Sequence, residues 1–280
     1  MIFSILIPSW NNLAYLQLCI RSIREHSAFN HQIIVHVNEG SDGTAAWLTE
    51  QQIPYTFTEK NEGICVAMNE AYRLSTSDYI VYMNDDMYVL PGWDTHLATD
   101  IESLNTHLFM LSSTMIEPRD TGNPCVIVRD FGDSLERFNE ESLLASFSSF
   151  QHHDWSGSCW PPNIIHRTMW EEIGGYNLYF SPGMSSDDDL AMRLWQKGCR
   201  IYKGVSASRV YHFQCKSTGR IEKNNGRKQF QQLYGMSQRI FRRYFLHTGE
   251  PYSGGLKGPG LNLNYYGNRL RVWLSNRFMN

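Results

Sequence analysis

The chain has 280 residues, which is enough for one large domain or for one domain with an appendage. Apolar residues make up 42% of it and aromatic residues 13%, which excludes a disordered chain. The net charge of −3 conceals a balance of −15 over residues 1–200 and of +12 over residues 201–280. This division predicts an anionic partner at the C-terminal end, unless the basic tail packs on the acidic body.

The cysteines and the apolar segments indicate where the protein resides. None of the six cysteines belongs to a C-x-x-C pair, so we expect reduced thiols rather than a disulfide framework. The first residues lack the basic segment of a signal peptide, and no apolar run reaches the roughly 18 residues of a membrane span. We therefore expect a cytoplasmic protein, with any membrane contact peripheral at the inner face of the membrane.

The first hundred residues predict alternating strands and helices. The expected strands are 3–7, 33–37, 55–58 and 79–83, and the expected helices are 14–26, 44–51, 63–74 and 92–103. This alternation predicts an α/β fold with a sheet of mainly parallel strands flanked by helices. Ligands of such sheets bind beyond the carboxyl ends of the strands, where the loops 8–12, 38–43, 59–63 and 84–87 lie.

The remaining segments are less regular. We expect a strand over 108–115, a helix or ordered loop over 135–150, a helix from 168, a helix over 190–197, and extended segments at 200–203 and 208–212. Beyond these, the pattern predicts a basic amphipathic helix over 226–246, a glycine-rich loop over 249–267 and a last helix over 268–278.

An acidic turn follows the fourth expected strand, where Asn84, Asp85 and Asp86 come in sequence. Adjacent carboxylates repel each other unless a cation or hydrogen-bond donors lie between them. Oxygen ligands suit Mg²⁺ or Mn²⁺, which also bind phosphate oxygens. The turn therefore predicts a divalent metal site, although Asn and Asp also favour ordinary turns.

Four segments follow one another along the first hundred residues, namely Ser4–Asn11, Val37–Thr44, Asn61–Asn69 and Asn84–Asp86. Their order resembles the family 2 glycosyltransferases of the GT-A fold. In that family, a strand ending in Pro is followed by a D-D-G-S-x-D-G-T loop, an N-x-G-x-x-x-A-x-N segment and a D-x-D turn. The resemblance covers roughly residues 2–215, so we expect a GT-A glycosyltransferase domain over 1–215 and a basic helical extension over 216–280.

The resemblance implies a donor site. Pro8 and Glu39 would border the nucleotide base and ribose, and Asp86 would be the main ligand of a Mn²⁺ or Mg²⁺ ion at the donor diphosphate. The same motifs supply further expected donor contacts, namely Ser9, Asn11, Asn61, Gly63, Asn69, Asn84 and Asp85. Two positions depart from the pattern, because Asn38–Glu39 replaces a pair of acids and Asn84 replaces the first Asp of D-x-D.

A second acidic segment runs from Asp187 to Asp189, after Gly174-Gly175-Tyr176-Asn177. It is similar to the G-G-F-D … E-D-x-D-L segment of the family, and the resemblance implies that Asp187 is the catalytic base, with Asp188 beside it at the substrate. Read locally, the same acids would cap a helix and stabilise its first turn.

Three more residues are candidates on weaker grounds. The family often has a histidine after the strand at 208–212, which makes His212 a candidate third metal ligand, although such a histidine is often simply packed. Trp155 and Trp160 could stack on an acceptor sugar or belong to the core. The adjacent His152 and His153 lack ligand spacing for zinc.

The predicted function is metal-assisted transfer of a sugar from a nucleotide donor, UDP by default, with inversion. The acceptor would be a glycan or lipid-linked oligosaccharide of a surface polysaccharide, with helix 226–246 on an anionic membrane or packed on the body, and no nucleic acid is expected. The alternative is a non-catalytic carbohydrate-binding or scaffold protein on a decayed GT-A fold. A pyrophosphorylase or NAD-dependent dehydrogenase is disfavoured, because the first strand is followed by no glycine-rich loop.

Overall fold

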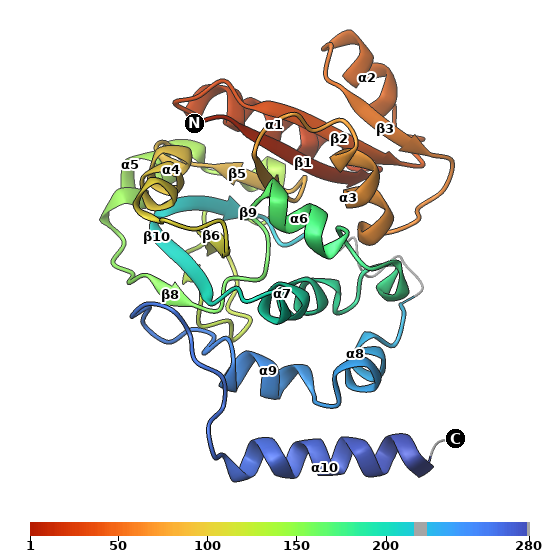
Figure 1. Ribbon diagram of the computed structural model, residues 1–280. Coiled ribbons are helices and arrows are strands. Elements are labelled where there is room, and N and C mark those ends of the chain that lie inside the picture. The colour runs from red at the N-terminus through yellow and green to blue at the C-terminus, as the bar shows by residue number, and fades with distance from the viewer. Residues whose placement is uncertain (216–222, 279–280) are drawn as a thin grey trace.

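The computed structural model describes residues 1–215 and 223–278. The first part of the chain alternates as expected (Figure 1). Its elements are β1 (Phe3–Trp10), α1 (Leu13–His26), β2 (Gln32–Asn38), α2 (Thr44–Glu50), β3 (Tyr55–Thr58), α3 (Ile64–Tyr72), β4 (Tyr79–Tyr82), β5 (Met87–Val89) and α4 (Trp93–Ser103). The three-residue strand β5, which follows the acidic turn directly, was not expected from the sequence.

The later elements include short strands that no clear pattern marks. They are β6 (Phe109–Glu117), β7 (Ile127–Val128), α5 (Glu140–Ser146), β8 (Trp155–Ser156), β9 (Asn163–His166), α6 (Arg167–Ile173), α7 (Ser186–Gln196), β10 (Ile201–His212), α8 (Gly226–Tyr234), α9 (Gln238–Tyr244) and α10 (Leu263–Phe278), with 3-10 turns at Leu135–Arg137, Phe147–Ser149 and Leu178–Phe180. The two extended segments expected at 200–212 are one strand, β10, whose pairing with β6 shifts between Val205 and Arg209.

The described strands form one mixed sheet in the order β3-β2-β1-β4-β9-β6-β10-β5, with β7 beside β6 and β8 beside β10. The pairs β1–β2, β2–β3, β1–β4 and β6–β10 are parallel, as predicted. β9 runs antiparallel between β4 and β6, and β5 runs antiparallel to β10. Since β5 returns beside β10, the acidic turn before it lies next to the end of β10.

Helices cover both faces of the sheet because side chains alternate along each strand. Along β1, Leu6 packs with α3, α6 and α7, whereas Ile5 and Ile7 point to the other face and pack with α1 and α4. The six cysteines form no disulfide, and five of them are buried. No helix among the described residues is long and apolar enough to cross a bilayer.

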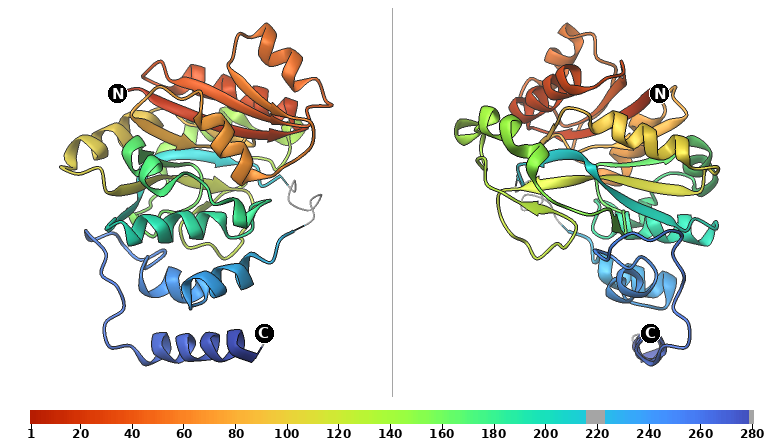
Figure 2. Two further views of the ribbon diagram at one scale, coloured as in Figure 1. Left: turned by 45° about the vertical axis from the view of Figure 1, so that its right-hand side comes forward. Right: turned by 90° about the vertical axis from the view of Figure 1, so that its left-hand side faces the viewer.

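The expectation of one helix over 226–246 is wrong. Gly235, with φ of +62°, ends α8, and α9 begins three residues later. The apolar side chains of both helices, Phe230 and Phe241, are fully buried against the core around α7. Figure 2 shows α10 beyond them, on the side away from the sheet. The predicted boundary at 215/216 adjoins residues 216–222, which lie outside the described residues, so this division stays a prediction.

Candidate active site

The first part of the site lies where β1 and β4 end side by side. Asp85 follows β4, and its two carboxylate oxygens accept hydrogen bonds from Ser9 Oγ (2.7 Å) and Asn12 Nδ2 (3.0 Å). Asn12 precedes α1, and its side chain makes no capping bond there. These bonds hold Asp85 at the end of β1, and Asn84 lies beside it, partly exposed.

Asp86 points the other way, toward β10. Its Oδ2 accepts a hydrogen bond from the backbone N–H of Cys215 (2.8 Å), and its Oδ1 lies 3.4 Å from Nε2 of His212. The opposite ring nitrogen, Nδ1, donates to Glu117 at the end of β6 (2.8 Å). Asp86 and Glu117 are 6% and 4% exposed, so this chain of three groups is largely shielded from water.

The charges in this chain stabilise each other. Burial opposes ionisation of Asp86, but His212 and the Cys215 N–H outweigh it and hold the pKa of Asp86 below its ordinary value. Burial also lowers the pKa of His212, but the carboxylates of Asp86 and Glu117 outweigh it and raise that pKa to about 10. The arrangement therefore suits a positive charge between Asp86 and Glu117.

The expected base and ribose contacts lie at the ends of β1 and β2. Pro8 is buried within β1, and Glu39 follows β2 with φ of +65° and accepts a hydrogen bond from Trp10 Nε1 (2.8 Å). Asn38, in place of the family's acid, is 3% exposed and accepts a bond from the backbone N–H of Glu62 (3.1 Å). The amide at this position therefore anchors the next loop.

Asn11 and Asn61 occupy loop positions. Asn11 has φ of +46°, and its Oδ1 is enclosed without a hydrogen-bond partner among the described residues. Asn61 accepts from the backbone N–H of Gly63 (2.9 Å), which forms a turn before α3. A Cβ on Gly63 would lie 2.3 Å from the carbonyl oxygen of Pro182, so the glycine permits close packing of the segment before α7.

Asn69 holds the residue that contacts Asp187. Its side chain accepts from the backbone N–H of Tyr176 and donates to the backbone carbonyl of the same residue, both at 2.8 Å. The amide is thus used within the protein, and we assign Asn69 to positioning Tyr176 rather than to direct donor contact.

Asp187 lies in the first turn of α7, half-buried, and accepts a hydrogen bond from Tyr176 Oη (3.0 Å). Burial and the neighbouring carboxylate of Asp188 raise the pKa of Asp187 to about 7, although Tyr176 and Arg242 act in the opposite direction. A carboxyl group that titrates near neutral pH is suited to accept a proton from a hydroxyl.

The next two acids bind cations instead. Asp188 accepts from Arg242 through Nε (2.6 Å) and a terminal nitrogen (2.8 Å), and also from Gln238 (2.7 Å). Asp189 accepts from Arg193 (2.7 Å) and from Tyr234 Oη (2.5 Å). Both aspartates are at most 1% exposed, and the carboxylate of Asp188 is bound by side chains of α9, so its expected contact with substrate stays a prediction.

The two acidic segments meet around Tyr82, the last residue of β4. This side chain is buried, and burial together with the carboxylates of Asp187, Asp85 and Asp86 raises its pKa. Its ring also packs edge-on against Tyr176, with centroids 6.0 Å apart. The sheet edge therefore brings the acidic turn and the N-terminal turn of α7 to one place.

The two tryptophans differ in exposure. Trp155 is 2% exposed, its ring lies against Gly204, and its Nε1 donates to Thr114 Oγ1 (2.9 Å), so it belongs to the core and offers no face to a sugar. Trp160 is partly exposed and lies under the Arg242 guanidinium, 4.8 Å from its ring centroid. Trp160 alone therefore remains a candidate contact for an acceptor.

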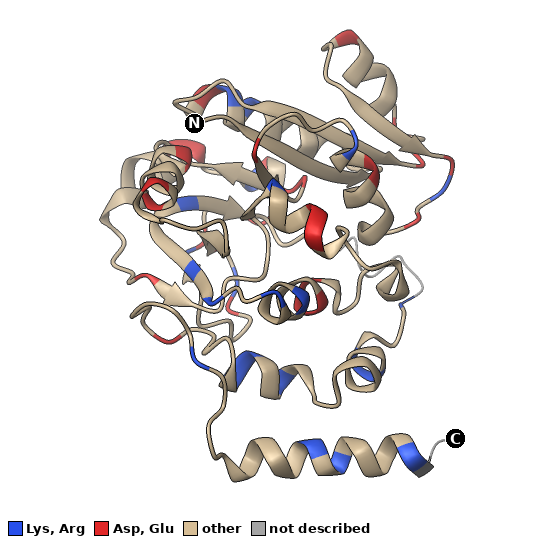
Figure 3. Cartoon of the chain, in the orientation of Figure 1, with Lys and Arg blue, Asp and Glu red and all other residues tan. Residues whose placement is uncertain are grey.

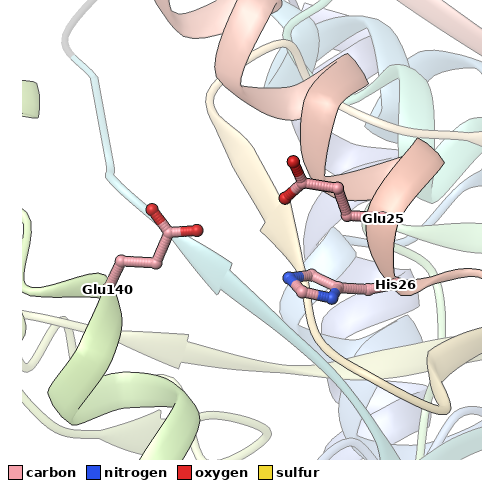
Figure 4. Close-up of side chains that lie close together, drawn as sticks. All are labelled: Glu25, His26 and Glu140. Atoms are coloured by element: carbon pink, nitrogen blue, oxygen red, sulfur yellow. The ribbon is translucent and has the colours of Figure 1, made fainter.

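A separate cluster brings potential ligands together at a different place. Figure 4 shows Glu25 and His26 of α1 facing Glu140 of α5, and among the described residues this is the group of three whose ligand atoms all lie within 4.8 Å of one another. Tyr88 Oη lies between His26 (2.7 Å) and Glu140 (2.5 Å), and Arg21 pairs with Glu140. These bonds connect α1 to α5, and we assign the cluster a structural role.

Three residues of the site were not predicted from the sequence. Glu117 is the last residue of the buried strand β6, and an acid at the carboxyl end of a strand is a signal for the ligand edge of the sheet. No motif distinguishes it in the sequence. Tyr176 lies in the Gly-Gly segment that carries the resemblance, but no role was expected for it. Arg242 lies in the segment expected either on an anionic membrane or packed on the body, and the packing of α9 shows its bond to Asp188.

Solved structures with a similar fold are glycosyltransferases. S. aureus TarS 1-349 in complex with UDP-GlcNAc superposes with a TM-score of 0.57 at 12% identity, over 84% of this chain and 65% of that one. GalNAc-T7 with UDP, GalNAc and Mn²⁺ gives 0.56 at 14% identity, over 80% of this chain and 44% of that one. The likeness shows that the sheet and its helices have the GT-A fold.

Sequence comparison identifies the family. Residues 4–148, slightly more than half of the chain, match the family described as glycosyl transferase family 2, and the chain belongs to that family. The putative colanic acid biosynthesis glycosyl transferase WcaA of Escherichia coli (strain K12) is 23% identical over 124 residues, which are 41% of this chain and 43% of that protein. The match thus spans less than half the length of this curated relative.

Proposed function

We propose that this glycosyltransferase moves a sugar from a nucleoside-diphosphate donor to an acceptor hydroxyl, with inversion. The observation that carries the proposal is Asp187, a half-buried carboxyl group with a pKa of about 7, held by Tyr176 near the acidic turn. Inversion requires a base on the acceptor side and charge stabilisation on the donor side, and the two acidic segments supply groups for each.

The residues around Asp86 fit a divalent cation. The 3.4 Å separation of Asp86 Oδ1 and His212 Nε2 is close to the roughly 3.0 Å between adjacent ligands of an octahedral ion. Glu117 on Nδ1 of His212 gives the carboxylate–histidine arrangement that orients metal-bound imidazoles. We propose Asp86 and His212 as ligands of Mn²⁺ or Mg²⁺. The ion would take the place of the proton that the two carboxylates favour on His212, and when bound it would offset negative charge on the leaving diphosphate.

The chain's own residues account for the proton. Asp187 accepts the proton of the acceptor hydroxyl as that oxygen bonds to the anomeric carbon and the bond to the diphosphate breaks. Tyr176 orients the carboxylate, and Asn69 fixes Tyr176 through two backbone bonds. Ser9 and Asn12 hold Asp85 at the donor side, where we propose Pro8, Asn11, Glu39 and Asn84 as further nucleotide contacts.

The comparisons support the substrate class. TarS binds UDP-GlcNAc in its solved structure, and GalNAc-T7 was solved with UDP and Mn²⁺. WcaA is described as an enzyme of colanic acid biosynthesis. We therefore propose UDP-sugars as the first donors to test and a surface polysaccharide or glycan as the product, made in the cytoplasm.

The direct test measures the release of UDP from several UDP-sugars with and without Mn²⁺. We expect slow metal-dependent hydrolysis that an acceptor accelerates. A carbohydrate-binding or scaffold protein on the same fold would bind the sugars without turnover, and this outcome would replace the enzyme proposal.

We propose that α10, rather than the segment 226–246, contacts the membrane. Leu263, Tyr266, Leu270, Trp273 and Leu274 recur at helical spacing and are 40% to 91% exposed, whereas Tyr265 and Val272 on the opposite side are buried. No acidic residue follows Glu250, and α10 contains Arg269, Arg271 and Arg277. An exposed apolar face with arginines matches an anionic lipid surface.

Vesicle flotation tests this contact. We expect the protein to float with vesicles that contain phosphatidylglycerol and far less with neutral phosphatidylcholine vesicles. Trp273→Ser should weaken flotation, while Phe57→Ser, which removes a similarly exposed aromatic ring from β3, should not. Equal flotation with both vesicle types, or equal losses in both variants, contradicts the proposal.

A further inference from the structure

A large basic cavity lies beside the second acidic segment. It has a volume of about 940 Å³ and is bounded by α8, α9, Trp160 and the loop 121–124. This volume lies within the range of roughly 300–1,000 Å³ that is typical of ligand-binding sites in proteins. Its walls contain Arg227, Arg239, Arg242 and Arg243.

The cavity adjoins the site at two places. Arg242 and Gln238 line it and also hold Asp188, the neighbour of Asp187. The loop 121–124 follows Glu117, the partner of His212, by a few residues. The cavity therefore lies beside the first turn of α7, which carries Asp187.

Among the residues that the structure describes, three of the four arginines of the cavity have no carboxylate partner. Within the described ranges, no carboxylate forms an ion pair with Arg227, Arg239 or Arg243. The acid that lines the cavity, Glu250, pairs with His247. Figure 3 shows α8 and α9 with basic residues and without acidic ones, in contrast to the body above them. Like charges held together around a hollow favour an anionic ligand.

The lining has a second property of a saccharide site. Trp160 is a partly exposed aromatic ring at the cavity wall, held beneath Arg242. Aromatic rings provide apolar surface for the carbon-bound hydrogens of a sugar, and the planar guanidinium fork matches phosphate and carboxylate oxygens. The two together select a saccharide that carries a negative charge.

We infer that this cavity binds the acceptor, and that the acceptor is an anionic saccharide with a phosphate or carboxylate group. The inference rests on the proposed function for the direction of transfer, but the anion site itself stands on Arg239, Arg243 and their neighbours. The anionic group lies among the arginines and the sugar lies against Trp160, so that a hydroxyl extends toward Asp187.

The test compares three probes in the presence of a UDP-sugar and Mn²⁺. The probes are a phosphorylated disaccharide, a glucuronate-containing disaccharide and a neutral disaccharide, and the readout is the acceleration of UDP release. We expect at least one anionic probe to accelerate release and the neutral one to have little effect. Which anionic probe is active distinguishes phosphate from carboxylate.

The variant is Arg239→Gln with Arg243→Gln, and the control is Arg73→Gln, an exposed arginine at the end of α3 outside the cavity. We expect the concentration of anionic probe at half-maximal acceleration to rise about tenfold for each arginine removed, and not to change in the control. Both arginines are exposed, so we expect the double variant to fold. Thermal melting checks this.

The outcomes separate the two proposals. Acceleration by the neutral probe alone, or equal responses of double variant and control, overturns the anionic acceptor cavity. Absence of UDP release from the wild type with every UDP-sugar overturns the proposed function and the acceptor assignment with it. UDP release that no anionic probe accelerates overturns only the cavity inference.

Discussion

The chain contains two acidic segments, 84–86 and 187–189, and they differ in what surrounds their charges. In the first, neutral donors hold Asp85 and a histidine lies beside Asp86, whose pKa stays low. In the second, arginines bind Asp188 and Asp189, whereas Asp187 accepts a hydrogen bond from the Tyr176 hydroxyl and has a pKa raised to about 7. The partner, rather than the residue type, thus decides whether a carboxylate is suited to bind a cation or to accept a proton.

The largest expected effect tests the cation side of this comparison. Asp86→Ala should reduce metal-dependent transfer by about 10³-fold or more, since loss of the ion removes several kcal/mol of charge stabilisation. Rates measured across a Mn²⁺ titration provide the readout. Asp85→Asn should lose much less, because Asp85 is directed toward Ser9 and Asn12. If Asp86→Ala and the more conservative Asp86→Asn both remain active, the metal assignment is wrong.

The second prediction tests the proton side. Asp187→Asn should lower the single-turnover rate by about 10²-fold or more, the usual scale for loss of a general base. Affinity for UDP, titrated separately, should hardly change, because the donor contacts lie at the ends of β1 and β4. If Asp187→Asn is active and Asp188→Asn is folded but inactive, the assignment of Asp187 as the base is wrong.

The third prediction concerns stability rather than chemistry. Asp189→Asn should lower the free energy of unfolding by about 3 kcal/mol, because it leaves Arg193, which is only 18% exposed, without its carboxylate partner. Asp188→Asn should cost less, since Arg242 is 37% exposed and water can solvate it. Urea unfolding measures the free energy of unfolding of the two variants. An equal loss in both would show that the exposure of the arginine does not control the cost of removing its carboxylate partner.

The smallest expected effect concerns pH. Since Asp187 must be ionised to accept a proton, the wild-type rate should rise with pH up to about 7 and then level off. The Tyr176 hydroxyl lowers the pKa of Asp187, so Tyr176→Phe should raise that pKa and move the rising limb to higher pH by up to about one unit. If the rate of Tyr176→Phe rises at the same pH as that of the wild type and is lower by one factor at every pH, then Tyr176 acts only through packing.

Local sequence patterns predicted much of this molecule. The strands at 3–7 and 55–58 and the helices at 14–26 and 92–103 follow from apolar spacing and from glycine, proline and asparagine at the ends, and they lie where expected. The acidic turn after the fourth strand and the order of the N-terminal motifs also identified the family. These features depend on neighbours within a few residues, which a sequence displays directly.

The tertiary structure alone decided which groups meet. Asn69 holds Tyr176 across 107 residues, Glu117 binds His212 across 95, and Asp188 binds Arg242 across 54. The short strand β9 joins β4 to β6, and β5 returns beside β10, but neither strand is long enough to show a period. Apolar periodicity determines which face of an element is buried, but the order in which elements pack determines the partner and hence the charge state of each acid.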